Sequence, residues 1–165
     1  MSSVVLDPES PPLVGAGPGQ AFVRFVANAF RLRGRASRSE YWWWMLINLV
    51  VVALAQFVLP WLIENRLPQP ALLFGPFGPW LAANITLFSV APTAAPQTAL
   101  AAGILIACGL WLLVTLIPGY TVAVRRLHDS NLSGWWVLLV LLPVGALIVL
   151  LLTTRRSRPE GARFD

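Results

Sequence analysis

Two short stretches of the chain hold most of the residue types that could take part in chemistry. The first motif, residues 34–44, combines arginine, serine and glutamate with three consecutive tryptophans. The second motif, residues 125–136, contains the only histidine, followed directly by an aspartate, and ends in a tryptophan pair. The candidate functional residues are Arg35, Ser37, Arg38, Glu40, Arg125, Arg126, His128, Asp129, Ser133, Trp135 and Trp136.

His128 beside Asp129 could act as an acid–base pair, because a nearby carboxylate tunes an imidazole toward pH 7. However, no nucleophile, metal-ligand cluster or phosphate-binding loop accompanies the pair, and neighbours in sequence often point apart. Cys108 is alone in an apolar run, so neither a disulfide nor a metal site is predicted. We expect no catalytic residue, metal or cofactor. A membrane-embedded enzyme or transporter that uses His128 and Asp129 is the alternative.

The basic residues indicate a different chemistry, the binding of anionic groups. All of them are arginine, and the net charge is +5. Guanidinium groups bind phosphate oxygens bidentately, although a GC-rich genome would also favour arginine over lysine. Because the arginines flank apolar runs, we expect anionic lipid headgroups rather than nucleic acid as the partner. A membrane-protein partner or a second copy of the chain is the alternative.

The composition places the chain in a membrane. Hydrophobic residues make up 57% of its 165 residues and charged residues only 12%. Between Glu40 and Arg125 the only charged residues are Glu64 and Arg66. Such a chain is too apolar and too unevenly charged for an ordinary soluble domain. Polar stretches such as the second motif must surface at a membrane face. We therefore predict an all-α integral membrane protein.

Hydrophobic periodicity divides the chain into a leader, a membrane domain and a tail. Gln20–Arg35 is predicted to be an interfacial helix, with Arg24, Asn28, Arg31 and Arg35 as a polar stripe opposite a Phe-rich face. Three transmembrane helices are expected, from the capping box of Ser37 and Glu40 to about Ile63, from Ala99 to Val124, and from Trp135 to Leu152. The predicted parts are a disordered leader at 1–19, a membrane domain at 20–152 with an external loop at 64–98, and a basic flexible tail at 153–165.

The distribution of arginines predicts a cytoplasmic N-terminus. With three crossings the second motif is cytoplasmic and the tail external. A re-entrant third segment, bent at Pro143, would keep the tail inside as well. A fourth helix within 64–98 is a further alternative, but it would put the second motif outside, and Gly75-Pro76 and Gly78-Pro79 interrupt that stretch. We adopt three membrane segments, because the two motifs then share one cytoplasmic face.

Two kinds of contact are expected from these placements. Glu40 should form an ion pair between the motifs, for example with Arg125 or Arg126, because it is the only acid of the first motif. Asn48 and Gln56 are the strongly polar residues of the first transmembrane helix. They should form hydrogen bonds with neighbouring helices, each contributing about 1 kcal/mol.

The two motifs together resemble a bacterial family called domain of unknown function 805. The residues that carry the resemblance are Gly34-Arg35-Ala36-Ser37-Arg38-Ser39-Glu40-Tyr41-Trp42-Trp43, Arg125-Arg126-Leu127-His128-Asp129 and Ser133-Gly134-Trp135-Trp136. The likeness covers about Phe22 to Asp165, with an apparent insertion from Pro68 to Thr98. In the tail, Ala162 stands where the family usually has Asn. The resemblance implies a small multi-pass protein of the bacterial inner (plasma) membrane, and it implies no established activity.

Overall fold

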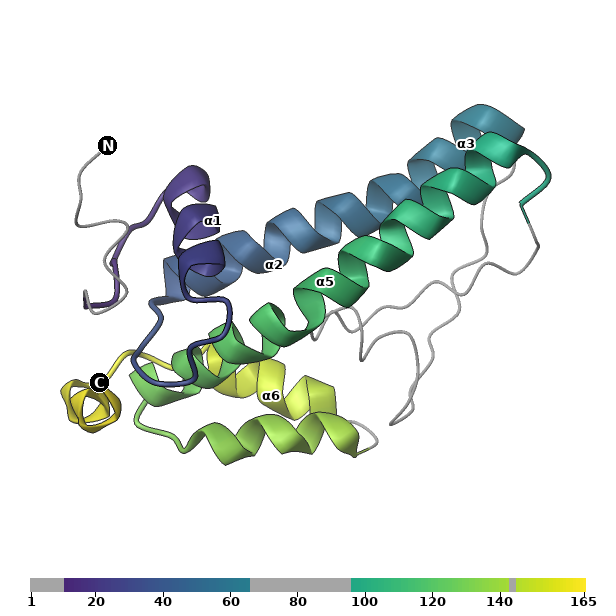
Figure 1. Cartoon of the computed structure of the whole chain (residues 1–165). Coiled ribbons are helices and arrows are strands. Elements are labelled where there is room, and N and C mark those ends of the chain that lie inside the picture. The colour runs from purple at the N-terminus through teal and green to yellow at the C-terminus, as the bar shows by residue number, and fades with distance from the viewer. Residues whose placement is uncertain (1–10, 66–95, 143–144) are drawn as a thin grey trace.

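The computed structural model describes residues 11–65, 96–142 and 145–165, and every element among them is helical (Figure 1). The elements are α1 (Pro18–Ala27), α2 (Arg38–Ala53), η2 (Leu54–Val58), α3 (Leu59–Glu64), α5 (Ala99–Asp129), η3 (Gly134–Leu141), α6 (Gly145–Thr153) and η4 (Pro159–Phe164). The all-α prediction is confirmed for these residues. Most of the predicted external loop, residues 1–10 of the predicted leader, and Pro143 lie outside them.

A long helical hairpin is the main feature of the fold. α2, η2 and α3 follow one another directly and form one arm, and α5 lies beside it in the antiparallel direction (Figure 1). α5 has 31 residues and is, within the described ranges, the one helix whose length and composition suit a membrane crossing. At about 1.5 Å per residue it extends about 46 Å, more than the hydrocarbon core of about 30 Å. Its C-terminal end carries the first half of the second motif.

Local sequence signals explain where the helices of the hairpin begin, change and end. Ser37 Oγ accepts a hydrogen bond from Glu40 N at 3.2 Å, and Ser37 N donates to Glu40 Oε2, so the predicted capping box is confirmed. The wider π-helical turn of η2 lies directly before Pro60, whose ring disrupts a regular helix. α5 continues through Pro118. Just beyond its end, Asn131 adopts a left-handed conformation with φ 61°.

The two arms meet through one polar contact and a small apolar cluster. Trp111 Nε1 donates to Asn48 Oδ1 at 3.0 Å, which confirms the inter-helix contact predicted for Asn48. The small apolar cluster between the arms consists of the buried residues Val52, Ala55, Cys108 and Leu112. The outer face of α5 is apolar and exposed, and Val114 is 72% exposed. An apolar outer face of this kind suits a lipid surrounding. The Gln56 side chain lies outside what the structure describes.

α1 is shorter than predicted, and the first part of its polar stripe is buried. It ends at Ala27 rather than Arg35, and the chain then turns through Asn28 toward the first motif. Arg24 and Asn28, expected on the polar stripe of an interfacial helix, are 2% and 3% exposed. Phe22 and Phe30 of the predicted Phe-rich face are exposed. The reason is tertiary: the buried carboxylate of Glu40 attracts Arg24 inward, as described below.

The residues from Trp135 to Leu152 form a helical hairpin rather than one straight helix. η3 and α6 lie antiparallel, so Thr153 returns to the end of the molecule where η3 begins (Figure 1). Val140 of η3 and Val149 of α6 are both buried, at 1% and 0% exposure, in the same cluster. The predicted single third helix is therefore wrong in shape, because η3 and α6 run in opposite directions.

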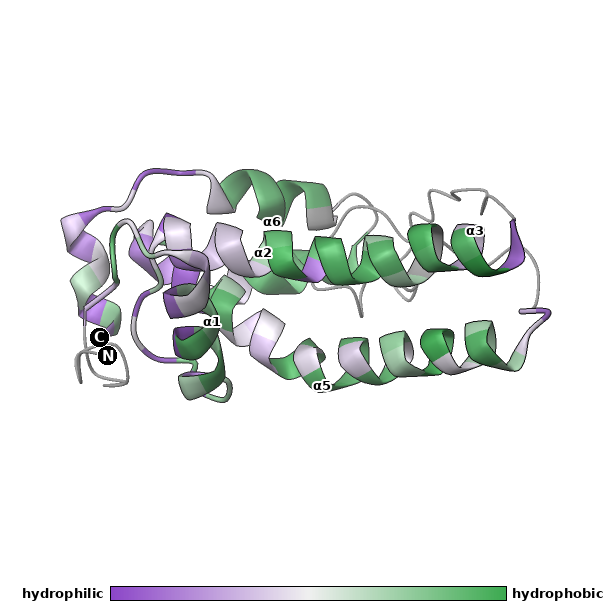
Figure 2. Ribbon diagram, turned by 90° about the horizontal axis from the view of Figure 1, so that it is seen from above, coloured by the Kyte–Doolittle hydropathy of each residue, from purple (hydrophilic) through white to green (hydrophobic). Residues whose placement is uncertain are grey.

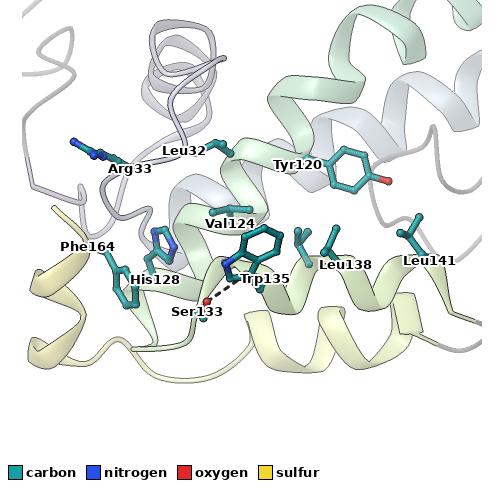
Figure 3. Close-up of a pocket in the computed structure, with 12 residues that line it drawn as sticks. Leu32, Arg33, Tyr120, Val124, His128, Ser133, Trp135, Leu138, Leu141 and Phe164 are labelled. Atoms are coloured by element: carbon teal, nitrogen blue, oxygen red, sulfur yellow. Dashed lines mark hydrogen bonds between the residues drawn. The ribbon is translucent and has the colours of Figure 1, made fainter.

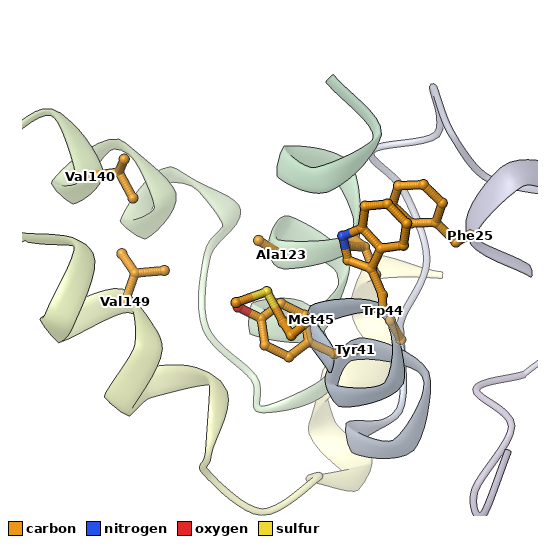
Figure 4. Close-up of a cluster of buried hydrophobic side chains, with 9 residues drawn as sticks. Phe25, Tyr41, Trp44, Met45, Ala123, Val140 and Val149 are labelled. Carbon is orange, nitrogen blue, oxygen red and sulfur yellow. The ribbon is translucent and has the colours of Figure 1, made fainter. Parts of the chain in front are cut away.

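The main core lies at the end where both motifs meet. Figure 4 shows its residues, which come from α1, the loop before α2, α2, α5, η3 and α6. The Phe25 ring stacks on Trp44 with centroids 3.5 Å apart and an interplanar angle of 12°. Tyr41 and Trp44 are fully buried. This core fixes α1 and the start of α2 against α5, and so holds the two motifs together.

Candidate functional site

The two motifs are joined mainly through backbone groups. Ala36 N donates to Arg125 O at 3.1 Å, and Arg125 Nη2 donates to Arg35 O at 2.9 Å. His128 Nδ1 lies 3.2 Å from Gly34 O. Because a carbonyl oxygen only accepts, Nδ1 is the donor in this contact. The segment before α2 is thereby attached along the last turns of α5, which brings the two motifs to one end of the molecule.

The buried acid of the first motif pairs with a residue outside both motifs. Arg24 Nε lies 2.7 Å from Glu40 Oε1, and both side chains are almost fully buried. Glu40 Oε1 also accepts from Leu13 N at 2.8 Å. The predicted ion pair of Glu40 with Arg125 or Arg126 is therefore corrected to one with Arg24. α1 places Arg24 closer to the carboxylate than the end of α5 places either predicted arginine.

A second buried network surrounds the acid of the second motif. Arg126 Nη1 donates to Asp129 Oδ2, and Ser157 Oγ donates to the same oxygen. Arg126 Nε donates to Thr153 O at 3.0 Å, and its Nη2 donates to Arg155 O. Arg126 is fully buried, so this network closes the space behind the second motif. It also fixes the end of α6 to the end of α5.

His128 and Asp129 point in different directions and do not form an acid–base pair. The His128 imidazole contacts Gly34 O and the Phe164 ring, whereas the Asp129 carboxylate binds Arg126 and Ser157. Within the described ranges, no three His, Cys, Asp or Glu side chains gather in a way that could hold a metal ion. The arrangement thus offers no proton relay between the two residues.

The C-terminal segment is packed on the second motif rather than flexible. Gly34 N donates to Phe164 O at 2.8 Å, and Arg158 N donates to Asp129 O at 2.8 Å. Arg35 forms a bidentate pair with Asp165, at 2.9 and 2.7 Å. These contacts correct the prediction of an unstructured tail, and they make η4 the third component of the site. Composition alone suggested a flexible segment, and it does not reveal such pairing.

Two glycines permit the close approach of the elements around His128. A Cβ on Gly134 would lie 2.6 Å from Val124 Cγ1 and 3.0 Å from His128 Nε2. A Cβ on Gly161 would lie 2.4 Å from His128 O. Real side chains do not tolerate such distances, so η3 and η4 can lie against α5 only because both positions lack a side chain.

A groove of about 710 Å³ opens between α5, η3, the loop after α1 and the end of η4. Figure 3 shows the rings of His128 and Phe164 at one end, and Tyr120 and Leu141 at the other. Its lining residues are Leu32, Arg33, Tyr120, Val124, His128, Ser133, Gly134, Trp135, Val137, Leu138, Leu141 and Phe164. Of the predicted site residues it includes His128, Ser133 and Trp135. Arg33, Tyr120 and Phe164 also line the groove, but they lie outside both motifs, so the sequence did not indicate them.

The two tryptophans of the second motif and Arg38 lie at the surface of this end. Trp135 is 78% exposed and Trp136 47% exposed. Ser133 Oγ accepts a hydrogen bond from Trp135 N at 3.4 Å. Arg38 is exposed, and its Nε donates to Arg155 O at 3.2 Å. Indole rings and arginines side by side are typical of the headgroup level of a membrane.

Every arginine of the described residues lies at this end of the molecule. They are Arg24, Arg31, Arg33, Arg35, Arg38, Arg125, Arg126, Arg155, Arg156, Arg158 and Arg163. Figure 2 shows hydrophilic residues concentrated at the end where α1 and the C-terminal segment lie, whereas the hairpin arms are largely hydrophobic. The molecule therefore has one basic, tryptophan-rich end and one long apolar body.

An all-helical, apolar hairpin with one basic end defines a small integral membrane protein. The chain belongs to the family described as Protein of unknown function (DUF805), whose model matches residues 29–165. It is 27% identical over 147 residues to inner membrane protein YhaH of Escherichia coli strain K12, covering 87% of this chain and 91% of the relative. It is 29% identical over 146 residues to inner membrane protein YhaI of the same strain, covering 88% and 92%. No solved structure matches it significantly. The predicted family and inner-membrane location are confirmed.

Proposed function

We propose that this protein crosses the inner membrane more than once and binds anionic lipid headgroups at a cytoplasmic Arg/Trp-rich site. That site consists of the two motifs and the C-terminal segment. The observation that carries the proposal is the gathering of all described arginines at one end. Each arginine near an anionic leaflet contributes about 1 kcal/mol of attraction. The exposed ones are Arg33, Arg38, Arg155, Arg156, Arg158 and Arg163.

The same geometry supports two crossings and one re-entrant hairpin. α5 is long enough to cross as a single helix, and α2, η2 and α3 together form a continuous arm (Arg38–Glu64) that is also long enough. The 9 residues of α6 extend only about 14 Å. η3 and α6 therefore enter and leave the membrane at the same face. With α1, the C-terminal segment and all described arginines at that face, the positive-inside rule makes it cytoplasmic. In this topology the tail is cytoplasmic rather than external.

α1 supports the proposal through its apolar face rather than its basic stripe. Phe22, Val26 and Phe30 are 39%, 57% and 80% exposed, while Arg24 is held inward by Glu40. An amphipathic helix with such a face lies in the membrane interface with its aromatic side toward the acyl chains. Attraction to headgroups then comes from Arg33 and the tail, which are exposed.

Reconstitution in lipid nanodiscs tests the proposal. Discs assembled from equal amounts of phosphatidylglycerol and phosphatidylethanolamine should retain an excess of phosphatidylglycerol around the protein. Replacing Arg155, Arg156 and Arg158 together by Gln should reduce that excess, and added salt should weaken it. The matched triple replacement by Lys should keep most of it, because lysine retains the charge. A wild-type protein that retains both lipids equally would refute the proposal.

A second candidate is association with a membrane-protein partner or a second copy. Ala99, Gly103 and Ala107 form a row of small residues on α5, and all three are exposed in the single chain. Small residues at this spacing permit close packing of helices in lipid. This surface lies on the hairpin arm, outside the basic end, so it is compatible with headgroup binding.

A further inference from the structure

We infer that the groove between α5 and η3 is a binding site for one phospholipid with an anionic headgroup. The inference rests on the proposed function and deepens it, because it separates one specific lipid from the general attraction of a basic surface. The phosphate would lie near Arg33, and one acyl chain would follow the groove toward Leu141. A volume of about 710 Å³ is within the range of about 300–1,000 Å³ typical of small-molecule sites.

The two ends of the groove differ in polarity, as a phospholipid does. At one end lie Arg33, the hydroxyl of Ser133 and the imidazole of His128. The Arg33 side chain is exposed, and Figure 3 shows its guanidinium directed away from His128, so it would turn toward the groove to bind a phosphate. Toward the other end the lining is apolar, with Val124, Leu138 and Leu141. Figure 3 shows this order along η3, with Leu141 farthest from His128.

The direction of the groove agrees with the proposed orientation in the membrane. His128 is at the basic end, and η3 leads from that end toward the turn of the re-entrant hairpin. The polar end of the groove is therefore at headgroup level and its apolar end within the hydrocarbon. A lipid bound in this direction would keep its phosphate at headgroup level and its acyl chain in the hydrocarbon core, as in a bilayer.

His128 adds a group suited to a hydroxylated headgroup. Its Nδ1 donates to Gly34 O, so in the neutral ring Nε2 is the hydrogen-bond acceptor. Among the described residues Nε2 has no hydrogen-bond partner, and it lies beside Gly134, where no side chain covers it. A glycerol hydroxyl of phosphatidylglycerol could donate to Nε2 while Arg33 binds the phosphate. This chemistry favours phosphatidylglycerol over a headgroup without hydroxyls.

The experiment uses full-length protein in nanodiscs and phosphatidylglycerol that carries a photoreactive diazirine on one acyl chain. Cross-linked peptides should map to the facing parts of α5 and η3, around Tyr120 and Leu138. Replacing Leu138 by Trp fills the groove and should remove most of the label there. Leu113→Trp, at an exposed position of α5 outside the groove, is the matched control. If Leu138→Trp does not fold, Leu141→Trp serves the same purpose.

Charge is tested with a second matched pair. Arg33→Gln should reduce labelling in the groove roughly fivefold, the factor that corresponds to one near-surface arginine. Arg33→Lys, which keeps the charge at the same position, is the matched control and should retain most of the labelling. Soluble glycerol phosphate in excess should not displace the label, because it lacks the acyl chain.

Each other outcome overturns the inference in a distinguishable way. Uniform labelling of all apolar faces, with phosphatidylglycerol still enriched in the discs, refutes the groove site but not the proposed function. Equal retention of both lipids refutes both. Displacement by glycerol phosphate indicates a site for a soluble phosphate. Label on the exposed faces of α5 but none in the groove of the wild-type protein also overturns the inference, and it indicates that another occupant, such as a second copy of the chain, fills the groove.

Discussion

The imidazole of His128 lies flat on the phenyl ring of Phe164, with centroids 4.1 Å apart and planes within 5° of parallel. This stack joins the last turn of α5 to the C-terminal helix η4. It also forms the polar end of the groove, because both rings line it. The only histidine of the chain therefore connects the second motif to a segment that contributes no motif of its own.

Loss of this stack should destabilise the protein. Phe164→Ala removes a ring contact that contributes about 0.5–1.5 kcal/mol beyond the burial of its area. The midpoint of thermal unfolding, followed by tryptophan fluorescence in detergent micelles, should fall. Phe30→Ala is the control, because Phe30 is 80% exposed and should leave the midpoint unchanged. Equal midpoints for the two variants would contradict the packing of η4 on His128.

A methyl group at Gly134 should separate η3 from α5. Gly134→Ala would place a Cβ 2.6 Å from Val124 Cγ1, and overpacking of this kind costs about 1–3 kcal/mol. Gly109→Ala, in a position of α5 with open space around it, should be neutral or stabilising. Combining Gly134→Ala with Val124→Ala should restore part of the lost stability. No difference between Gly134→Ala and Gly109→Ala would refute the close approach.

The buried pair of Arg24 and Glu40 should show strong coupling. Either Arg24→Gln or Glu40→Gln leaves the other charge buried without its partner, at a cost of about 3–5 kcal/mol. The double variant should cost clearly less than the sum of the two. Asp165→Asn, which breaks the partly exposed pair with Arg35, should cost less than about 1 kcal/mol. Additive effects of the Arg24 and Glu40 substitutions would show that the pair does not form.

Asn48 and Trp111 should be coupled across the two arms of the hairpin. Asn48→Leu removes the acceptor for Trp111 Nε1, and Trp111→Phe removes the donor. A double-mutant cycle on thermal unfolding should give a coupling of about 1 kcal/mol, as is usual for hydrogen bonds between helices in membranes. A coupling near zero would mean that the arms pack without this contact.

The features that sequence predicted well depend on local patterns. The spacing of Ser37 and Glu40 determines a capping box, because both partners lie within one turn. The lone polar Asn48 in an apolar helix needs a partner on a neighbouring helix, and Trp111 provides it. The meeting of the two motifs followed from their shared pattern of arginine, serine and tryptophan, and the structure brings both to one end.

The features that sequence did not predict depend on contacts between distant segments. Arg24 has helical spacing with other polar residues, but the buried carboxylate of Glu40 attracts it inward, so this part of the polar stripe is buried. Phe164 lies in a basic tail whose composition indicates flexibility, and only the bare surface at Gly161 lets it reach His128. The groove combines residues from four separate segments of the chain, so no single sequence motif predicts it.

The proposed topology requires that both motifs and the tail lie on the cytoplasmic face of the membrane. It can be measured by labelling single cysteines with a membrane-impermeant reagent in a Cys108→Ser background. The positions Ser10, Gln69, Ser133 and Ala162 sample the predicted leader, the predicted external segment, the second motif and the tail. Intact cells should label only the cysteine at Gln69, and opened cells should label all four. Labelling at Ala162 from outside would contradict the re-entrant hairpin, and labelling at Ser133 from outside would exclude a shared cytoplasmic site.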